Sequence, residues 1–349
     1  MRRCRARATL PGVLTCVLAL LLVATAPAQQ RPESPPLTPL KDLVRLECKD
    51  GVLELNWTNG VPAAARRISA QGPEGRWVVE PIAGNRSGIL ITRGQAGTRR
   101  PDQFTDITIS TTAGAVTIIA ERAINPAALR LAQRGHQLAL TVVSTGKATN
   151  FASADLLDLR AQRPAIVREI LLPILEQVTG EPDLLLPGAA DAYRVFDQIG
   201  ADERTAVRVN ELLSKLAAPA AGDRVHATDE LESLGERAIP ALLRVDRDSL
   251  SPEAAGRVAQ IIAHRTRRSF DDPASMRDDA MFLVDCLEFN DDRIRAAARA
   301  RLEQLRGTSI SIQDTAIPAD WSRAADQLRT ILAARHAVER ENGAGNRAR

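Results

Sequence analysis

Histidine is the side chain that most often performs acid–base and metal chemistry near neutral pH, and the sequence holds few of them. They are His136, His226, His264 and His336. None stands in an H-x-x-x-H pattern or beside a cysteine, so the chain has no zinc motif. His136 falls in an expected hairpin turn, and His264 closes an expected helix next to Arg265. We therefore expect structural or surface roles for the histidines.

Serine nucleophiles and phosphate-binding loops are also absent as motifs. The chain has no G-x-S-x-G, and the segment GNRSG at 84–88 has its serine at the wrong position and is typical of a turn. It has no P-loop and no G-x-G-x-x-G. The sequence thus predicts no catalytic residue, no cofactor site and no metal ligand, and we expect a protein that is not an enzyme. A hydrolase whose site residues meet only in the fold stays open as an alternative.

Aspartates gather between residues 270 and 292. They are Asp271, Asp272, Asp278, Asp279, Asp285, Asp291 and Asp292. Calcium needs several oxygens that converge on one point, and no window here fits the EF-hand loop. Asp272 before Pro273 and the run Asn290-Asp291-Asp292 are typical of helix caps instead. Caps are the favoured interpretation, and an acidic metal site is the alternative.

Two tryptophans, Trp57 and Trp77, lie in the part of the chain that we expect to form strands. Exposed aromatic side chains are a common feature of sugar-binding modules. Trp57, however, shares one face of its expected strand with Leu53 and Leu55, which favours a place in the core. A carbohydrate or cell-wall ligand is therefore the second interpretation of the strand region.

The first 28 residues have the layout of a signal peptide. Four arginines, at positions 2, 3, 5 and 7, precede an apolar run at 10–24, and Ala26-Pro27-Ala28 suits a signal peptidase. The run is shorter than a membrane span, so an uncleaved anchor is the less favoured alternative. We expect an exported protein, periplasmic or extracellular, with no stable membrane insertion after cleavage. A Pro-rich linker is expected at 29–41.

Removal of four arginines from a chain of net charge +3 leaves a mature chain near −1. Such a chain has no global field to attract nucleic acid, so we expect no nucleic-acid partner. The basic run at 264–268, HRTRR, is typical of a solvated helix end. Cys48 and Cys286 remain after cleavage, and we favour free buried thiols, with a disulfide between them as the alternative.

Residues 42–146 alternate between apolar and polar side chains, as strands do. Hairpin turns are predicted at Asp50-Gly51, at Gly114 and at Arg134-Gly135, where alternating runs meet. Shorter runs, RRISA, RWVVE and GILIT, lie between the first and second of these turns. The region therefore predicts eight or nine short strands in a sandwich or a barrel-like domain.

After residue 150 the apolar period changes to that of helices. Connecting helices are predicted over 151–218, the first capped by Ser153. The apolar stripe of the helix over 165–178 is wide enough to predict nearly full burial, with a kink or break at Pro173 and an end at Gly180. Further helices are expected at 189–198 and 202–217.

Short helices continue over 223–340, and two segments share one apolar spacing. The set is Ala227, Leu231 and Leu234 before Gly235, then Ala298, Leu302 and Leu305 before Gly307. Ile239, Pro240 and Leu243 follow the first copy, and Arg295 opens the second. Ser251 should cap a helix that buries Ala254, Val258, Ile261 and Ile262, and a last helix should bury Trp321, Ala325, Leu328 and Leu332.

These segments resemble HEAT-type helical repeats, in particular the divergent ones of exported bacterial proteins. The resemblance covers about residues 223–337, implies a protein-binding surface, and supplies no catalytic residue. A disordered tail is expected at 341–349. The sequence as a whole predicts an α+β multidomain protein, with an all-β sandwich or barrel-like domain followed by an all-α HEAT-like domain. We expect an exported, non-enzymatic protein that holds another protein on its helical surface.

Overall fold

A computed structural model describes one compact unit of the chain, residues 37–349. The described residues are 38–58, 67–72, 75–82, 88–93, 104–122, 128–144, 146–307, 309–310, 312 and 317–347, without the side chains of 104–105, 122 and 336–347. The expected signal peptide at 1–28, most of the expected linker at 29–41, and residues 84–87 of the GNRSG turn lie outside them.

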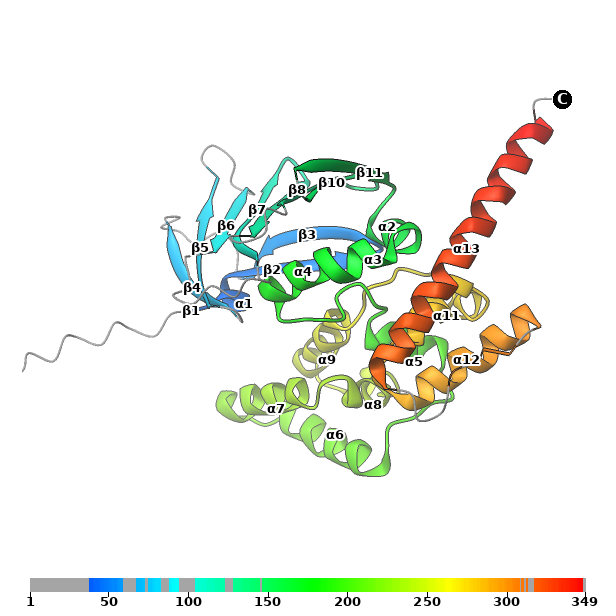
Figure 1. Cartoon of the computed structure of the whole chain (residues 1–349). Helices are drawn as coiled ribbons and strands as arrows, with labels where there is room; N and C mark the ends of the chain where they lie inside the picture. The colour runs from blue at the N-terminus through cyan, green and yellow to red at the C-terminus, as the bar shows by residue number, and fades with distance from the viewer. Residues whose placement is uncertain are drawn as a thin grey trace, which may run out of the picture. The chain divides into compact units, whose positions relative to one another are not determined.

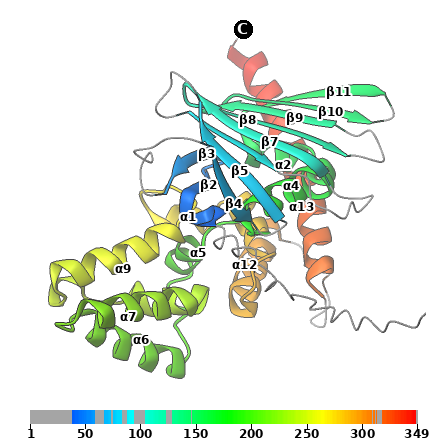
Figure 2. The same cartoon turned by 90° about the vertical axis from the view of Figure 1, so that its left-hand side faces the viewer.

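The strands form one large sheet and one separate hairpin (Figures 1 and 2). The large sheet has nine strands in the order β1-β4-β5-β6-β7-β8-β9-β10-β11. Their bounds are β1 Thr38–Pro39, β4 Ile68–Gly72, β5 Gly75–Pro81, β6 Ile89–Arg93, β7 Phe104–Thr112, β8 Ala115–Arg122, β9 Ala128–Arg134, β10 Leu138–Ser144 and β11 Lys147–Ser153. From β4 to β11 every neighbour in the sheet is the next strand of the chain and runs antiparallel to it.

The hairpin consists of β2 (Val44–Lys49) and β3 (Val52–Trp57), which pair only with each other. Its turn has positive φ at Asp50 (49°) and Gly51 (78°), the conformation that a two-residue hairpin requires. The same pair of signs occurs at Ala113 and Gly114, between β7 and β8. The turns predicted at Asp50-Gly51, Gly114 and Arg134-Gly135 are confirmed. The two comparable sheets of a sandwich are not formed, because the meander keeps adding strands to one sheet.

Strand β11 was not predicted from the sequence, because most of its side chains are exposed and no apolar alternation marks it. It pairs with β10 across the turn at Gly146 and forms one edge of the large sheet. Ser153 is its last residue and does not cap a helix. The cap of α2 is Asp155, whose carboxylate accepts the backbone N–H groups of Leu157 and Asp158 at 2.9 Å each.

A second layer covers one face of the large sheet (Figure 1). It contains the β2–β3 hairpin, α2 (Leu156–Gln162), α3 (Pro164–Ile166), a π-helical turn (Val167–Leu171) and α4 (Leu172–Thr179). The break expected at Pro173 is present, since the π turn stands directly before α4, and Gly180 ends α4 with φ 74°. The prediction that the helix over 165–178 is almost fully buried was wrong. One stripe of it is buried and the opposite side carries charges such as Arg168 and Glu176.

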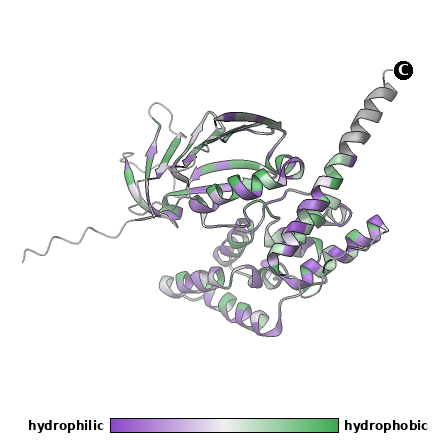
Figure 3. Cartoon of the chain, in the orientation of Figure 1, coloured by the Kyte–Doolittle hydropathy of each residue, from purple (hydrophilic) through white to green (hydrophobic). Residues whose placement is uncertain are grey.

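The remaining helices form a region with its own core, separate from that of the sheet. They are α5 Ala189–Val195, α6 Glu203–Leu216, α7 Ala221–Ser233, α8 Ile239–Leu242, α9 Pro252–His264, α10 Pro273–Met276, α11 Ala280–Cys286, α12 Asp292–Arg306 and α13 Pro318–Arg347. In Figure 3 these helices carry both hydrophobic and hydrophilic residues, as amphipathic helices do. The chain passes from the core of the sheet region to the core of the helical region between Leu185 and Ala189. This point lies within the segment predicted as connecting helices.

The expected apolar stripes are largely present in the helical region. Ser251 caps α9 by accepting the N–H of Ala254, and the predicted stripes of α9 and α13 are buried. In the two similar segments Ala227, Leu231, Ala298 and Leu302 are buried, but the third members differ. Leu234 is half-buried and Leu305 is 43% exposed, so the expectation for Leu305 was wrong. Helix α13 runs on to Arg347, through most of the segment where a disordered tail was expected.

The segment after α9 connects the helical region with the hairpin. The backbone C=O of Arg265 accepts the N–H of Ala190 at 2.9 Å, and the C=O of Arg267 accepts the N–H of Asp50 at 3.0 Å. The buried carboxylate of Asp191 accepts the backbone N–H groups of Arg267 (2.7 Å) and Arg268 (2.9 Å). One short segment is therefore hydrogen-bonded both to α5 and to the turn between β2 and β3.

A substitution at Gly188 tests how closely the segment after α9 packs against the start of α5. A Cβ atom at Gly188 would lie 2.0 Å from the carbonyl oxygen of Arg265. We therefore expect Gly188→Ala to lower the free energy of unfolding by about 2 kcal/mol, because the backbone must shift. Gly256→Ala is the matched control, since a Cβ there meets nothing within 4 Å and should stabilise α9 by ~0.5–1 kcal/mol. Urea denaturation measures both, and equal effects of the two substitutions would contradict the close packing.

Candidate functional site

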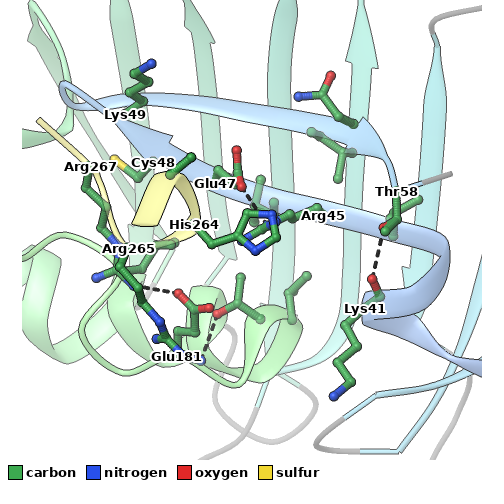
Figure 4. A pocket seen from close by; sticks show the side chains of 18 of the residues that line it. Lys41, Arg45, Glu47, Cys48, Lys49, Thr58, Glu181, His264, Arg265 and Arg267 are labelled. Carbon is green, nitrogen blue, oxygen red and sulfur yellow. Dashed lines mark hydrogen bonds and ion pairs between the residues drawn. The ribbon is translucent and has the colours of Figure 1, made fainter. Parts of the chain in front are cut away.

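A groove of about 820 Å³ lies between the β2–β3 hairpin and the helical region (Figure 4). One wall is the whole of β2 with α1 (Leu40–Leu43), which precedes it. The other walls are the end of α4 and the last turns of α7 and α9. Strand β2 directs Val44, Leu46 and Cys48 into the core of the sheet region, while the side chains that alternate with them are more exposed.

The base of the groove is apolar and its rim is charged. The apolar lining residues include Ile91, Val178, Leu184, Leu231 and Ile261. The charged and ionisable lining residues include Lys41, Arg45, Glu47, Lys49, Glu181, His264, Arg265 and Arg267. Two ion pairs stand within this rim, Arg45 with Glu47 (2.6 Å) and Arg267 with Glu181 (2.6 Å). Such a lining offers both apolar contact and orientation by polar groups, which is typical of a binding site.

His264, the last residue of α9, lies in front of β2 near Arg45 and Glu47 (Figure 4). Burial lowers the pKa of His264, and the guanidinium of Arg45 lowers it further, while Glu232 and Glu47 act in the opposite direction. The imidazole is therefore neutral at pH 7. His264 stands at a helix C-terminus, as predicted from the sequence, but it lines a groove instead of an open surface.

Cys48 is the thiol that borders the groove. Burial raises the pKa of the Cys48 thiol to about 11, although Arg268 and Arg267 lower it in part. The thiol is therefore protonated near neutral pH and is a poor nucleophile. Cys286 is likewise buried and free, so the interpretation of both cysteines as free buried thiols is confirmed.

A second cluster of charges is buried between α2 of the sheet layer and helices α11 and α13. Three arginines surround Asp285 in α11, namely Arg160, Arg268 and Arg329. Arg329 donates to Asp285 at 2.7 Å, and Arg160 donates to Glu288 at 2.5 Å. Burial alone would raise the pKa of Asp285, but the three guanidinium groups together hold it below its ordinary value. The expectation of a solvated basic run at 264–268 was wrong for Arg268, which is buried here.

The other aspartates of this acidic stretch act mainly as helix caps. Asp272, Asp279 and Asp291 cap α10, α11 and α12 by accepting N–H groups of the first turn. Asp278 pairs with Arg301 of α12. Within the part of the chain that the structure describes, no group of three or more His, Cys, Asp or Glu residues is placed to hold a metal ion.

The remaining candidate residues lie apart from the groove, with one exception. His136 and His226 are exposed, near Asp155 and Glu230 respectively, and the side chain of His336 is outside the described residues. Trp77 is fully buried. Trp57 is half-buried and lines the groove, while Leu53 and Leu55 on the same face are buried.

Among the described residues His264 forms no ion pair or hydrogen bond with a carboxylate, and the thiol of Cys48 is protonated. Searches of family models, curated proteins and solved structures found no match to this chain. Over the residues that the structure describes, none of the helices has both the length and the apolar character to cross a membrane.

The pKa of His264 provides a test of the groove geometry. We expect the imidazole to titrate below its ordinary value of 6.5, and Arg45→Met to raise its pKa, because a nearby positive charge is removed. Histidine-resolved NMR titration measures both. Arg76→Met in β5 is the control and should leave the pKa of His264 unchanged. An unchanged pKa in Arg45→Met would place His264 away from β2.

The buried cluster should control stability. We expect Arg329→Met to lower the free energy of unfolding at pH 7 by about 3 kcal/mol. The negative charge of Asp285 stays buried in this variant, but it has lost one of the positive charges that compensate it. The folded-state pKa of Asp285 is depressed, so its stabilising effect is present above its unfolded value and is lost as the pH falls below about 4. The variant should therefore show a weaker loss of stability in acid than the wild type.

The control for this substitution is Arg323→Met on the same helix, where Arg323 pairs with Asp320 at the surface. Exposed pairs contribute little, so its denaturation curve should match that of the wild type. Similar curves for Arg329→Met and Arg323→Met at pH 7 would show that the buried cluster has no special role.

Proposed function

We propose that the chain is an exported, non-enzymatic protein that binds another protein. The observation that carries this proposal is the groove between the hairpin and the helical region, with its apolar base and its charged rim. Two structurally distinct regions supply its walls, as is common for binding sites between domains. The signal-peptide pattern of residues 1–28 supports export to the periplasm or the extracellular space.

The helical region supports the same proposal. Helices α6 and α7 are joined by residues 217–220, and Arg208 of α6 pairs with Glu230 of α7. Together with the stripes in α7 and α12, this pairing supports a relationship to HEAT-type repeats, whose faces bind proteins. We place the partner where the last turns of α7 and α9 face the hairpin, because the lining there combines apolar and charged groups.

A carbohydrate or cell-wall ligand is the second candidate, and Trp57 is the observation that favours it. Trp57 lines the groove, and aromatic rings pack well against sugar faces. Trp77, the other aromatic considered for this role, is fully buried and has no access to a ligand. Binding of the chain to a glycan array, lost in Trp57→Ala, would favour this candidate over a protein partner.

A photo-crosslinking side chain at Gln260 tests the proposal in cells. Gln260 is exposed and lines the groove on α9, so we expect covalent adducts between this position and another protein. The same cross-linker at Ala296, which is exposed on α12 away from the groove, should give none. Mass spectrometry of the cross-linked bands identifies the partner. Equal adducts at both positions, or no adduct at Gln260, would contradict a partner in the groove.

A further inference from the structure

Strand β2 has one paired edge and one open edge. In an antiparallel hairpin, alternate residues exchange backbone hydrogen bonds, and the residues between them direct their N–H and C=O groups the other way. The two-residue turn makes Lys49 and Val52 a bonded pair, and Thr58 N–H donates to Leu43 C=O further along. Val44, Leu46 and Cys48 therefore direct their backbone groups away from β3.

The chain itself closes both ends of this open edge. The backbone N–H of Asp50 also points away from β3, and it donates to the C=O of Arg267 at 3.0 Å. At the other end the N–H of Val44 donates to the C=O of Leu40. Between these ends lie the C=O of Val44 and both backbone groups of Leu46 and Cys48. Among the residues that the structure describes, these groups have no hydrogen-bond partner.

The open edge borders the groove. Every residue of β2 lines it, including Leu46 and Cys48, whose side chains are buried in the core. The residues that carry the unpaired backbone groups are thus all among those that line the groove. Gln260, Ala263 and His264 of α9 line the same groove, and α4, which contacts β2, borders it with Val178 and Thr179.

We propose that an extended segment of the partner protein binds along β2 by strand addition. This inference rests on the proposed function and specifies the chemistry of its partner. Backbone N–H and C=O groups that recur every second residue match another extended polypeptide, which repeats the same groups at about 3.3 Å per residue. A sugar or a small anion does not repeat donors and acceptors in this way.

The lining also specifies the side chains of the bound segment. In a sheet, neighbouring side chains of adjacent strands share a face. One set of alternate side chains would lie on the face of Val44 and Leu46, where the base of the groove is apolar. The other set would lie beside Arg45 and Glu47 at the rim. The bound segment therefore alternates apolar and polar residues, with an acid across from Arg45 and a base across from Glu47.

A backbone-directed test uses seven-residue peptides selected from a phage-displayed library with apolar residues at alternate positions. Each selected peptide is then made with N-methyl groups on its odd or on its even amides. Only one of these sets donates to β2, so we expect one analogue to lose binding by at least about 100-fold in fluorescence anisotropy and the other to retain it. Similar effects of both sets, or no peptide that binds the purified chain, would overturn strand addition.

A matched pair of variants locates the binding. Ala263 is exposed in the wall of the groove, and Ala263→Trp should raise the Kd of the peptide at least about ten-fold by filling the space beside β2. Ala296→Trp on α12 should leave the Kd unchanged. Bound peptide should also slow hydrogen exchange of the Leu46 and Cys48 amides. Unaltered exchange, or equal binding by both variants, would refute this location.

The two proposals fail in distinguishable ways. If Gln260 cross-links to a partner protein but the N-methyl analogues show no alternation, the groove binds a protein by another mode and strand addition is wrong. If neither cross-links nor peptide binding occur, the protein-binding function is wrong as well.

Discussion

The hydrogen bonds of the segment after α9 are the constraint on which the groove depends. Asp191 at the start of α5 holds the backbone of Arg267 and Arg268, and Arg267 in turn accepts the N–H of Asp50 in the hairpin turn. Burial raises the pKa of Asp191, while the N–H groups that it accepts act to lower it. These bonds hold the hairpin turn against the residues that follow α9, and so help to set the width of the groove between them.

The buried ion pairs connect the two regions at a second place. Arg160, Arg268 and Arg329 converge on Asp285 and Glu288, so they join α2 of the sheet layer to α11 and α13 of the helical region. Buried pairs add little net stability relative to an apolar core, but removing one partner is costly. Their geometric demands therefore favour one relative placement of the two regions over others. This restriction matters here because the groove is formed by residues of both regions.

Local features were predictable from the sequence, and distant combinations were not. The turn at Asp50-Gly51, the break at Pro173 and the cap at Ser251 follow from backbone preferences of a few residues, and all are present. Strand β11 was missed because its side chains are mostly exposed and leave no pattern. The groove was missed because Arg45 and His264 are more than two hundred residues apart, and nothing local records that their elements meet. The basic run containing Arg268 was misassigned for the same reason, since its acidic partners lie in other helices.

An open strand edge is ordinarily a hazard, because it pairs with any other exposed strand. Several features limit this hazard at β2. The edge is short, closed at both ends by Arg267 and Leu40, and bordered by α9 along the groove. The helices that form the walls of the groove thus limit the approach of other strands to β2.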